Sequence, residues 1–396
     1  MSTPVRLGAG FWRVWSASTV SELGSGLTYV ALPLLTVTLT RDARLVSLVG
    51  AAQALPFLLF GLQSGAVADR LDRRRIMWAT DVLRAALTAL LVLLVITGPL
   101  TVGVLCGLAF ALGAADILFL NASAAIIPDL VAPEGLERAN AWLGSAQVVA
   151  SSFVGLPLGA LVFGLSRSAP FAVDAGSFAI AAALVLALRG SFRSVRTGTA
   201  TMRQDVREGV VWLWGHQLLR ALALLLAVIN AAFAAGEVVL VLYALEDLHA
   251  GRLGYSLLLG VLALGSVVGG AATPSLRGRF GVRPVIGTAA ALMALGVLVP
   301  GVTTRLPLVL LGLFAAGVGT LRWNVSTITL RQQLVPAEML GRVTSAYRLV
   351  GLGAMPLGAV AGGLVGHAVG LRAVYLLAGA VLALAVVVAL PRLRTA

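Results

Sequence analysis

The sequence contains no lysine, and all 29 of its basic residues are arginine. Charge of either sign is scarce, because only 11% of the 396 residues are charged, whereas soluble domains average about 25%. Hydrophobic residues make up 59% of the chain, and the mean hydropathy is +0.99. These values exclude an ordinary soluble domain and supply enough apolar sequence for roughly twelve membrane spans of about 20 residues each.

The residues that most catalytic and metal sites require are also scarce. The single cysteine, Cys106, excludes an intrachain disulfide, and the three histidines are scattered along the chain. The sequence has neither a phosphate-binding loop ending in Gly-Lys-Ser/Thr nor a nucleophile–histidine arrangement. It therefore predicts no enzyme activity, no metal and no cofactor.

The net charge of +13 and the pI of 11.4 would indicate nucleic-acid binding in a soluble protein. Here the arginines flank apolar segments, so the predicted partner is the lipid bilayer with its anionic headgroups, and no nucleic acid. An arginine-only chain rich in Ala, Gly, Leu and Val is typical of a GC-rich bacterial genome. We therefore expect a multi-pass protein of the bacterial plasma (inner) membrane.

Nearly charge-free segments recur along the chain and predict an all-α polytopic membrane protein with twelve transmembrane helices. The predicted spans are 14–39, 45–68, 76–97, 101–126, 139–165, 169–188, 219–245, 253–276, 284–303, 306–330, 343–366 and 371–391. With a cytoplasmic N-terminus, twenty arginines fall on the cytoplasmic side and six on the outer side. The positive-inside rule then places both termini in the cytoplasm.

The longest loop, 189–218, divides the chain into an N-terminal half, 1–188, and a C-terminal half, 219–396. Within the loop, Val206, Val210, Leu213 and Trp214 recur at helical spacing. This pattern favours a cytoplasmic linker helix in the lipid headgroup region over an ordinary polar linker.

An internal repeat relates the two halves. Residues 110–123, FALGAADILFLNAS, align with 314–326, FAAGVGTLRWNVS, and 130–138, LVAPEGLER, with 334–342, LVPAEMLGR. A third match pairs 156–165, LPLGALVFGL, with 355–364, MPLGAVAGGL. The offsets are nearly constant, and each half holds six spans, so the halves have the same orientation. We expect a pseudo-two-fold axis along the membrane normal.

A dense cluster of charges follows the second span. Two glycines, Gly61 and Gly65, precede Asp69, Arg70, Arg73 and Arg74. This stretch resembles the signature after the second span of the major facilitator superfamily, and the span count, central loop and repeat extend the resemblance over essentially the whole chain. The resemblance implies the fold of that superfamily, a small-molecule transporter working by alternating access, and a monomer.

The cluster has a physical interpretation as a cytoplasmic gate. The two glycines would let a neighbouring helix backbone approach closely, and Asp69 would pair with Arg73 and meet the positive end of another helix. The alternative is that the arginines only set topology, which explains neither the acid nor the glycines. In the second half Thr273 stands at the position of Asp69, so the gate should be asymmetric.

The fifth span contains GLPLGA, in which Gly155, Pro157 and Gly159 loosely resemble a motif of the superfamily's antiporters. These residues would allow helix bending or close packing. Segments 11–27 and 119–141 resemble the branch of macrolide-efflux proteins and enterobactin exporters. The resemblance implies export of a drug, an antibiotic or a siderophore-like amphiphile.

Charges inside spans are costly and call for a reason. Glu22, Asp116, Glu237 and Arg322 fall in spans 1, 4, 7 and 10, which line the central cavity in the resembled fold. We interpret the acids as carriers of a coupling proton, exchanged against substrate. The repeat lets Asp116 and Arg322 face each other, either in transport or as a structural pair, whereas the two glutamates have no evident partner.

Two further intramembrane acids receive structural interpretations. Asp81 and Arg84 are three residues apart and should pair on one face of the third span, and Asp174 should lie at headgroup level near the outer surface. The predicted function is proton-coupled export of amphiphilic small molecules. The alternatives are a nutrient importer or uniporter of the same fold and a transport-inactive membrane sensor.

Overall fold

The computed structural model describes residues 7–190, 192 and 202–395, and every regular element in this part of the chain is helical. The first half contains α1 (Ala9–Leu39), α2 (Ala43–Arg70), α3 (Arg73–Thr97), α4 (Val102–Leu130), η1 (Pro133–Gly135), α5 (Leu136–Gln147), η2 (Val148–Gly155), α6 (Leu156–Leu165) and α7 (Ala169–Leu186). The remaining helices are α8 (Met202–Gly215), α9 (Gln217–Leu242), η3 (Tyr243–Asp247), α10 (Gly251–Phe280), α11 (Val282–Val302), α12 (Leu306–Leu334), α13 (Ala337–Gly353), α14 (Met355–Ala368) and α15 (Leu371–Thr395).

Twelve stretches of the described chain are long and apolar enough to cross a membrane, which confirms the predicted fold class. The fifth span is continuous through α5, η2 and α6, and the eleventh is interrupted near Ala354, between α13 and α14. The predicted break at 97–101 is confirmed. Gly98 ends α3 with a φ of 89°, and the Thr101 side chain accepts a hydrogen bond from Val104 N to begin α4.

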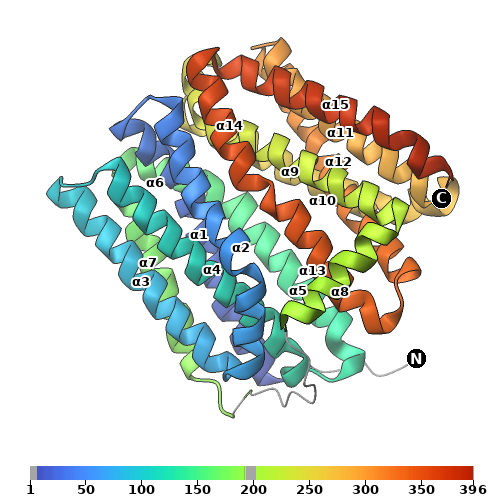
Figure 1. Cartoon of the computed structure of the whole chain (residues 1–396). Coiled ribbons are helices and arrows are strands. Elements are labelled where there is room, and N and C mark those ends of the chain that lie inside the picture. The colour runs from blue at the N-terminus through green and yellow to red at the C-terminus, as the bar shows by residue number, and fades with distance from the viewer. Residues whose placement is uncertain (1–6, 191, 193–201, 396) are drawn as a thin grey trace. The chain divides into compact units, whose positions relative to one another are not determined.

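The chain divides into two compact units. The first unit is Met1–Leu39 with Leu55–Gly198, and the second is Thr40–Ala54 with Thr199–Ala396. In the first unit α1 and α3 both pack against α7, and α3 packs against α4 (Figure 1). In the second unit α9 and α11 both pack against α15, and α11 packs against α12. The same neighbours therefore recur in the same order, as the sequence repeat predicts.

The repeat extends to single backbone contacts. A Cβ on Gly159 would lie 2.8 Å from the Cα of Leu27, and one on Gly358 would lie 2.6 Å from the Cα of Ala231. Leu27 and Ala231 are separated by the repeat offset of 204 residues. In each unit, a glycine after the Pro-Leu pair thus lets one helix backbone rest directly on the first helix of that unit.

The predicted linker helix is present as α8, whose position relative to a membrane stays a prediction. Leu213 is fully buried, whereas Trp214 is 41% exposed. Glu208 of α8 forms an ion pair with Arg342 of α13 at 2.5 Å, and Gly209 lies against the backbone of the same arginine. The helix is therefore anchored to α13 by charge and by close backbone packing.

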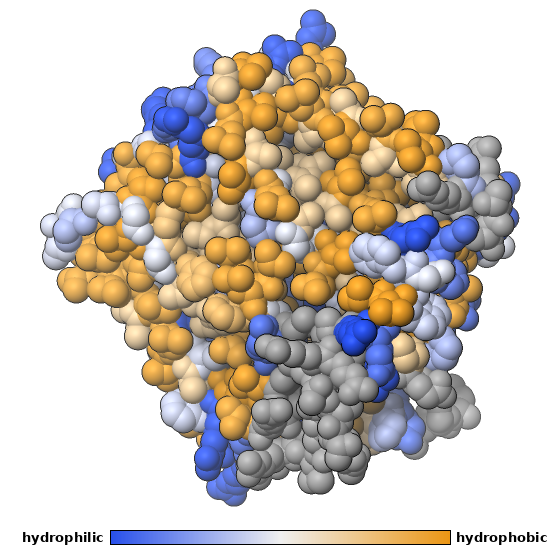
Figure 2. All heavy atoms as spheres, viewed as in Figure 1, coloured by the Kyte–Doolittle hydropathy of each residue, from blue (hydrophilic) through white to orange (hydrophobic). Residues whose placement is uncertain are grey.

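The surface is that of a protein surrounded by lipid. Hydrophobic residues cover most of the described surface on the face shown in Figure 2. Large aliphatic side chains are exposed along transmembrane helices of both units, for example Leu93 at 55% and Leu384 at 65%. Such exposure would promote aggregation in water, whereas hydrocarbon solvates these side chains.

Candidate functional site

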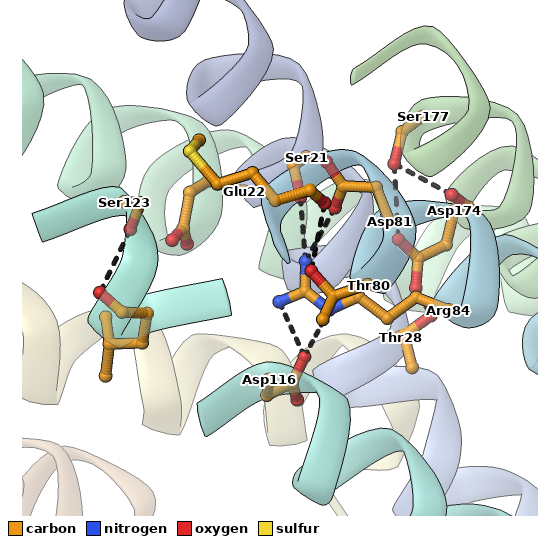
Figure 3. A network of polar contacts seen from close by, with 12 residues as sticks. Ser21, Glu22, Thr28, Thr80, Asp81, Arg84, Asp116, Ser123, Asp174 and Ser177 are labelled. Atoms are coloured by element: carbon orange, nitrogen blue, oxygen red, sulfur yellow. Dashed lines mark hydrogen bonds and ion pairs between the residues drawn. The ribbon is translucent and has the colours of Figure 1, made fainter. Parts of the chain in front are cut away.

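A buried arginine lies at the centre of the main polar cluster of the first unit. Arg84 of α3 is only 6% exposed. Its guanidinium donates from Nε to Oδ1 of Asp116 on α4 at 2.7 Å, and from Nη1 to Oδ1 of Asp81 at 3.0 Å. A longer contact of 3.5 Å reaches Ser21 of α1 (Figure 3). The predicted Asp81–Arg84 pair is confirmed, and Asp116 joins it.

Aromatic rings fix the same guanidinium. Its carbon lies 4.5 Å from the ring centroid of Phe119 and 4.8 Å from that of Phe178. Cation–π attraction to two rings adds to the hydrogen bonds that the guanidinium makes at its edge. Arg84 therefore has both charged and aromatic partners that hold it in one orientation.

The placement of Asp174 at headgroup level is wrong. Asp174 of α7 is 1% exposed and accepts a hydrogen bond of 2.5 Å from Thr28 of α1. The Ser177 hydroxyl contacts both its main-chain carbonyl and its carboxylate. Position along the sequence suggested an outer residue, but this side chain is part of the buried polar interior of the first unit.

Glu22 of α1 completes this set of acids. It accepts a hydrogen bond of 3.1 Å from the Gln147 amide at the end of α5, and it interacts electrostatically with Arg84 and Asp116. One more oxygen is notable, because Oδ2 of Asp81 is buried and has no hydrogen-bond partner in the described part of the chain. We call Glu22, Asp81, Arg84, Asp116 and Asp174 the acid network, in which four carboxyl groups accompany one arginine.

The remaining predicted intramembrane charges belong to the second unit. Arg322 lies on α12, and its Nε is buried without a hydrogen-bond partner among the described residues. The predicted facing of Asp116 and Arg322 stays a prediction, and the structure supplies Arg84 as the partner of that acid within its own unit. Glu237 of α9 is not isolated as expected, because it interacts with neighbours that include Tyr255 and Tyr375.

The charged cluster after α2 ties three helices of the first unit together. Arg73 forms an ion pair of 2.5 Å with Asp129 at the end of α4. Arg74 donates to the last carbonyls of α7, at 3.3 Å to Val185 and 2.6 Å to Leu186. Positive charge at a helix C-terminus is favourable because of the helix dipole.

An acid within the cluster begins the next helix. Asp72 is the N-cap of α3, where its carboxylate accepts from the backbone N–H groups of Arg74 and Arg75. The side chains of Asp69 and Arg70, and Gly65, lie outside the described residues, so their predicted roles stay predictions. Sequence reasoning missed Asp129, although it lies in a segment that the internal repeat had already marked.

The expectation of close backbone approach at Gly61 is wrong. A Cβ there would lie 3.6 Å from the Ile117 side chain, which is an ordinary van der Waals contact. The second unit shows the predicted geometry instead. Added Cβ atoms at Gly265 and Gly269 of α10 would lie 3.1 Å from the Cα of Phe314 and 2.7 Å from the Cα of Val318 on α12. The glycine pair therefore serves backbone packing in the second copy.

Both interpretations of the GLPLGA stretch are supported by the geometry. Gly155 lies against Gly26 of α1, with an added Cβ 2.8 Å from its Cα. The preceding segment, η2, is π-helical, and Leu156 N–H bonds to the carbonyl of Ser151, five residues back. Pro157 follows and has no N–H to donate. The fifth span thus combines close packing with a local change of helical winding.

The comparison with known sequences decides the family. The sequence profile of transmembrane secretion effectors, a family of the major facilitator superfamily, matches residues 2–395. The chain belongs to this family. It is 30% identical to the multidrug efflux pump Tap of Mycolicibacterium fortuitum, over 96% of this chain and 95% of the relative. It is 23% identical to macrolide efflux protein A of Streptococcus pyogenes, over 93% and 92% of the two chains.

Solved structures show the same fold for this transporter family. The crystal structure of the nucleoside transporter NupG superposes with a TM-score of 0.80 at 12% identity, covering 98% of this chain and all of that chain. At such identity the likeness concerns the fold alone. The protein is therefore a multi-pass bacterial membrane transporter of the major facilitator superfamily, with a small molecule as substrate.

Proposed function

We propose that this transporter exports amphiphilic small molecules, such as drugs, antibiotics or siderophore-like compounds, by proton antiport with alternating access. The efflux relatives over nearly the full chain support the export direction. The acid network supports proton coupling, and it is the observation that carries the proposal.

The network is suited to holding a proton because its charges do not balance. With all four acids ionised and Arg84 positive, its net charge would be −3. Isolated charge is costly to bury, and protonation of a carboxyl group removes that cost. Glu22 and Asp116 are more accessible than the fully buried Asp81. In this proposal, the former two exchange the proton, while Asp81 and Asp174 hold the arginine and α7 in place.

The remaining predicted residues have supporting roles in this mechanism. Gly61, Gly65, Asp69, Arg70, Arg73 and Arg74 form the cytoplasmic gate, and the GLPLGA glycines permit the fifth span to move against α1. Glu237 and Arg322 are the contribution of the second unit to the transport path. Residues 1–188 and 219–396 act as the two transport domains, joined by the linker at 189–218.

Reconstitution in liposomes tests proton coupling. An imposed pH gradient should drive accumulation of radiolabelled erythromycin, with proton movement reported by an internal pH-sensitive dye. Glu22→Gln and Asp116→Asn should lose uphill accumulation by about tenfold or more, since each removes a proton carrier. Glu134→Gln, an exposed acid of η1, is the matched control.

The results separate the candidate functions. Substrate exchange that persists without uphill accumulation would identify the acids as coupling residues. Accumulation in both amide variants equal to that of wild type would refute the proton-carrier role, and downhill movement only, in wild type, would indicate a uniporter. Absence of any substrate movement in wild type, across a panel of amphiphiles, would favour a sensor.

The proposed orientation has its own test. Both termini and the linker 189–218 should be cytoplasmic. In a Cys106→Ser background, Arg394→Cys should be labelled by a membrane-impermeant maleimide only after the cells are permeabilised, and Thr304→Cys should be labelled in intact cells. The reverse pattern would invert the topology.

A further inference from the structure

The second unit contains a cleft whose polar groups the mechanism above does not use. It lies among α9, α12 and α13 and has a volume of about 480 Å³, within the range of small-molecule sites. Its lining combines apolar with polar side chains: Leu226, Asn230, Asn324, Thr327, Ile328, Arg331, Gln332, Leu340, Thr344, Tyr347, Arg348 and Leu352. No aspartate or glutamate is among these lining residues.

The central polar group of this cleft is the buried guanidinium of Arg331. The residue is 7% exposed, and its Nη1 is buried with no hydrogen-bond partner in the described part of the chain. The guanidinium carbon lies 3.9 Å from the ring centroid of Tyr347, so one flat face is covered by the ring. A guanidinium that is stacked on one face still presents N–H groups at its edge, where carboxylate and phosphate oxygens bind.

A second arginine strengthens the field in the cleft. Arg348 lies one residue beyond Tyr347 on α13, and its positive charge repels that of Arg331. Two like charges around one cleft, with no acid in its lining, leave a positive potential that an anion would relieve. A buried donor without a partner is costly, so the site is more stable with an acceptor bound.

We propose that this cleft binds the anionic head group of an amphiphilic organic molecule. Arg331 supplies the charged donors, and Arg348 adds positive charge. Leu226, Ile328 and Leu340 contact the apolar body. The inference rests on the proposed export function only in identifying the ligand as cargo, because binding itself requires no transport. It predicts that the substrates include carboxylates, sulfonates or phosphates.

Binding to the purified protein in neutral detergent tests the site. The probe is 1-naphthaleneacetate, and 1-naphthaleneacetamide has the same ring system with an uncharged head. Isothermal titration calorimetry should show that the acetate binds about tenfold or more tightly than the amide, because only the acetate carries a charge for the arginines. Competition by inorganic phosphate would reinforce the assignment.

Variants locate the binding in the cleft. Arg331→Gln should weaken acetate binding about tenfold or more and leave amide binding within about twofold, because the substitution removes the charged donor. Arg348→Gln should give a smaller loss, since its residue is exposed. Arg252→Gln, an exposed arginine at the start of α10, removes the same charge elsewhere in the unit and should change neither affinity.

Three outcomes would overturn the proposal. The first is equal affinity for acetate and amide in wild type, a comparison that needs no variant to fold. The second is loss of the acetate preference in Arg252→Gln as strongly as in Arg331→Gln. The third is displacement of the probe only by phosphatidylglycerol in lipid nanodiscs, which would identify a lipid headgroup site. Because none of these measurements requires a pH gradient, they are independent of the proton-coupling test.

Discussion

The two units share a helical framework but differ in the charges that they bury. In the first unit, four acids gather around Arg84, whose guanidinium has both charged and aromatic partners. In the second unit, Arg331 is equally buried but contacts Tyr347, and an atom of its guanidinium has no hydrogen-bond partner among the described residues. The first cluster carries an excess of negative charge and the second an excess of positive charge.

The repeat shows where this difference arose. At the offset of 204, Asp81, Arg84 and Asp116 correspond to Val285, Thr288 and Thr320, and Arg331 corresponds to Ile127. Glycine contacts such as those of Gly159 and Gly358 are retained. Backbone packing thus constrains both copies alike, whereas the polar positions have diverged. A duplicated scaffold can therefore place proton chemistry in one unit and anion recognition in the other.

The largest expected effect comes from removing the central arginine of each unit. Arg84→Gln should lower the free energy of unfolding by about 3–5 kcal/mol, because it leaves buried acids without their cation. Arg331→Gln should change it by about 1 kcal/mol or less, since only a cation–π contact is lost. Thermal denaturation in detergent measures both, and equal losses would contradict the difference between the units.

Glycine substitutions should give the next largest effect. Gly269→Ala should cost about 1–3 kcal/mol, because its methyl group would meet the Val318 backbone of α12. Gly61→Ala should be neutral, or stabilising by up to about 1 kcal/mol, since the new methyl group finds ordinary contact distance and alanine favours the helix. The melting temperatures of the two variants, compared with wild type, check the prediction. A destabilised Gly61→Ala would restore the close approach predicted from sequence.

The gate provides a functional comparison of the same repeat. Asp69→Asn should reduce proton-driven flux by about tenfold, as expected for loss of a charged contact, whereas Thr273→Ala removes only a hydroxyl that bonds to its own helix at Gly269 and should reduce flux by less than about twofold. Initial rates in liposomes at matched protein content provide the measurement. Equal losses would show that the gate is symmetric.

The smallest expected effect lies at an exposed pair of the second unit. Hydrogen bonds from Arg44, at 2.7 Å to the carboxylate, lower the pKa of Asp42 to about 2, and His367 lies 3.2 Å away. A depressed pKa stabilises the folded state above the unfolded value of about 4, and this contribution disappears as pH falls toward the folded value. The slight excess in melting temperature of wild type over Asp42→Asn should therefore fade between pH 4 and about pH 2. A difference independent of pH would show that the carboxylate charge is not its cause.

Sequence reasoning located the helices well because each depends on local hydrophobicity and on few breaks. The span count, the break at Gly98 and the linker helix all follow from patterns within about 20 residues. The Asp81–Arg84 pair was also predictable, because its members are three residues apart on one helix.

The rest of the site depends on contacts between distant segments. Nothing local distinguishes Asp174, which binds Thr28 across 146 residues, or Asp129, which binds Arg73 across 56. The error at Gly61 has the same origin, since a glycine pair shows that close approach is possible but does not show which copy of a repeat uses it. Packing between helices decides these questions.

The π-helical winding of η2 has a consequence for the hydrogen bond that Gln147 makes with Glu22. An α-helix turns by about 100° per residue, so conversion of η2 to regular α-helical bonding would rotate the preceding segment by roughly that angle relative to the part held by Gly155 and Gly159. The amide of Gln147 would then point away from Glu22. A change of winding in the fifth span is thus a screw motion that disconnects a carboxyl group of the first span without separating the two helices.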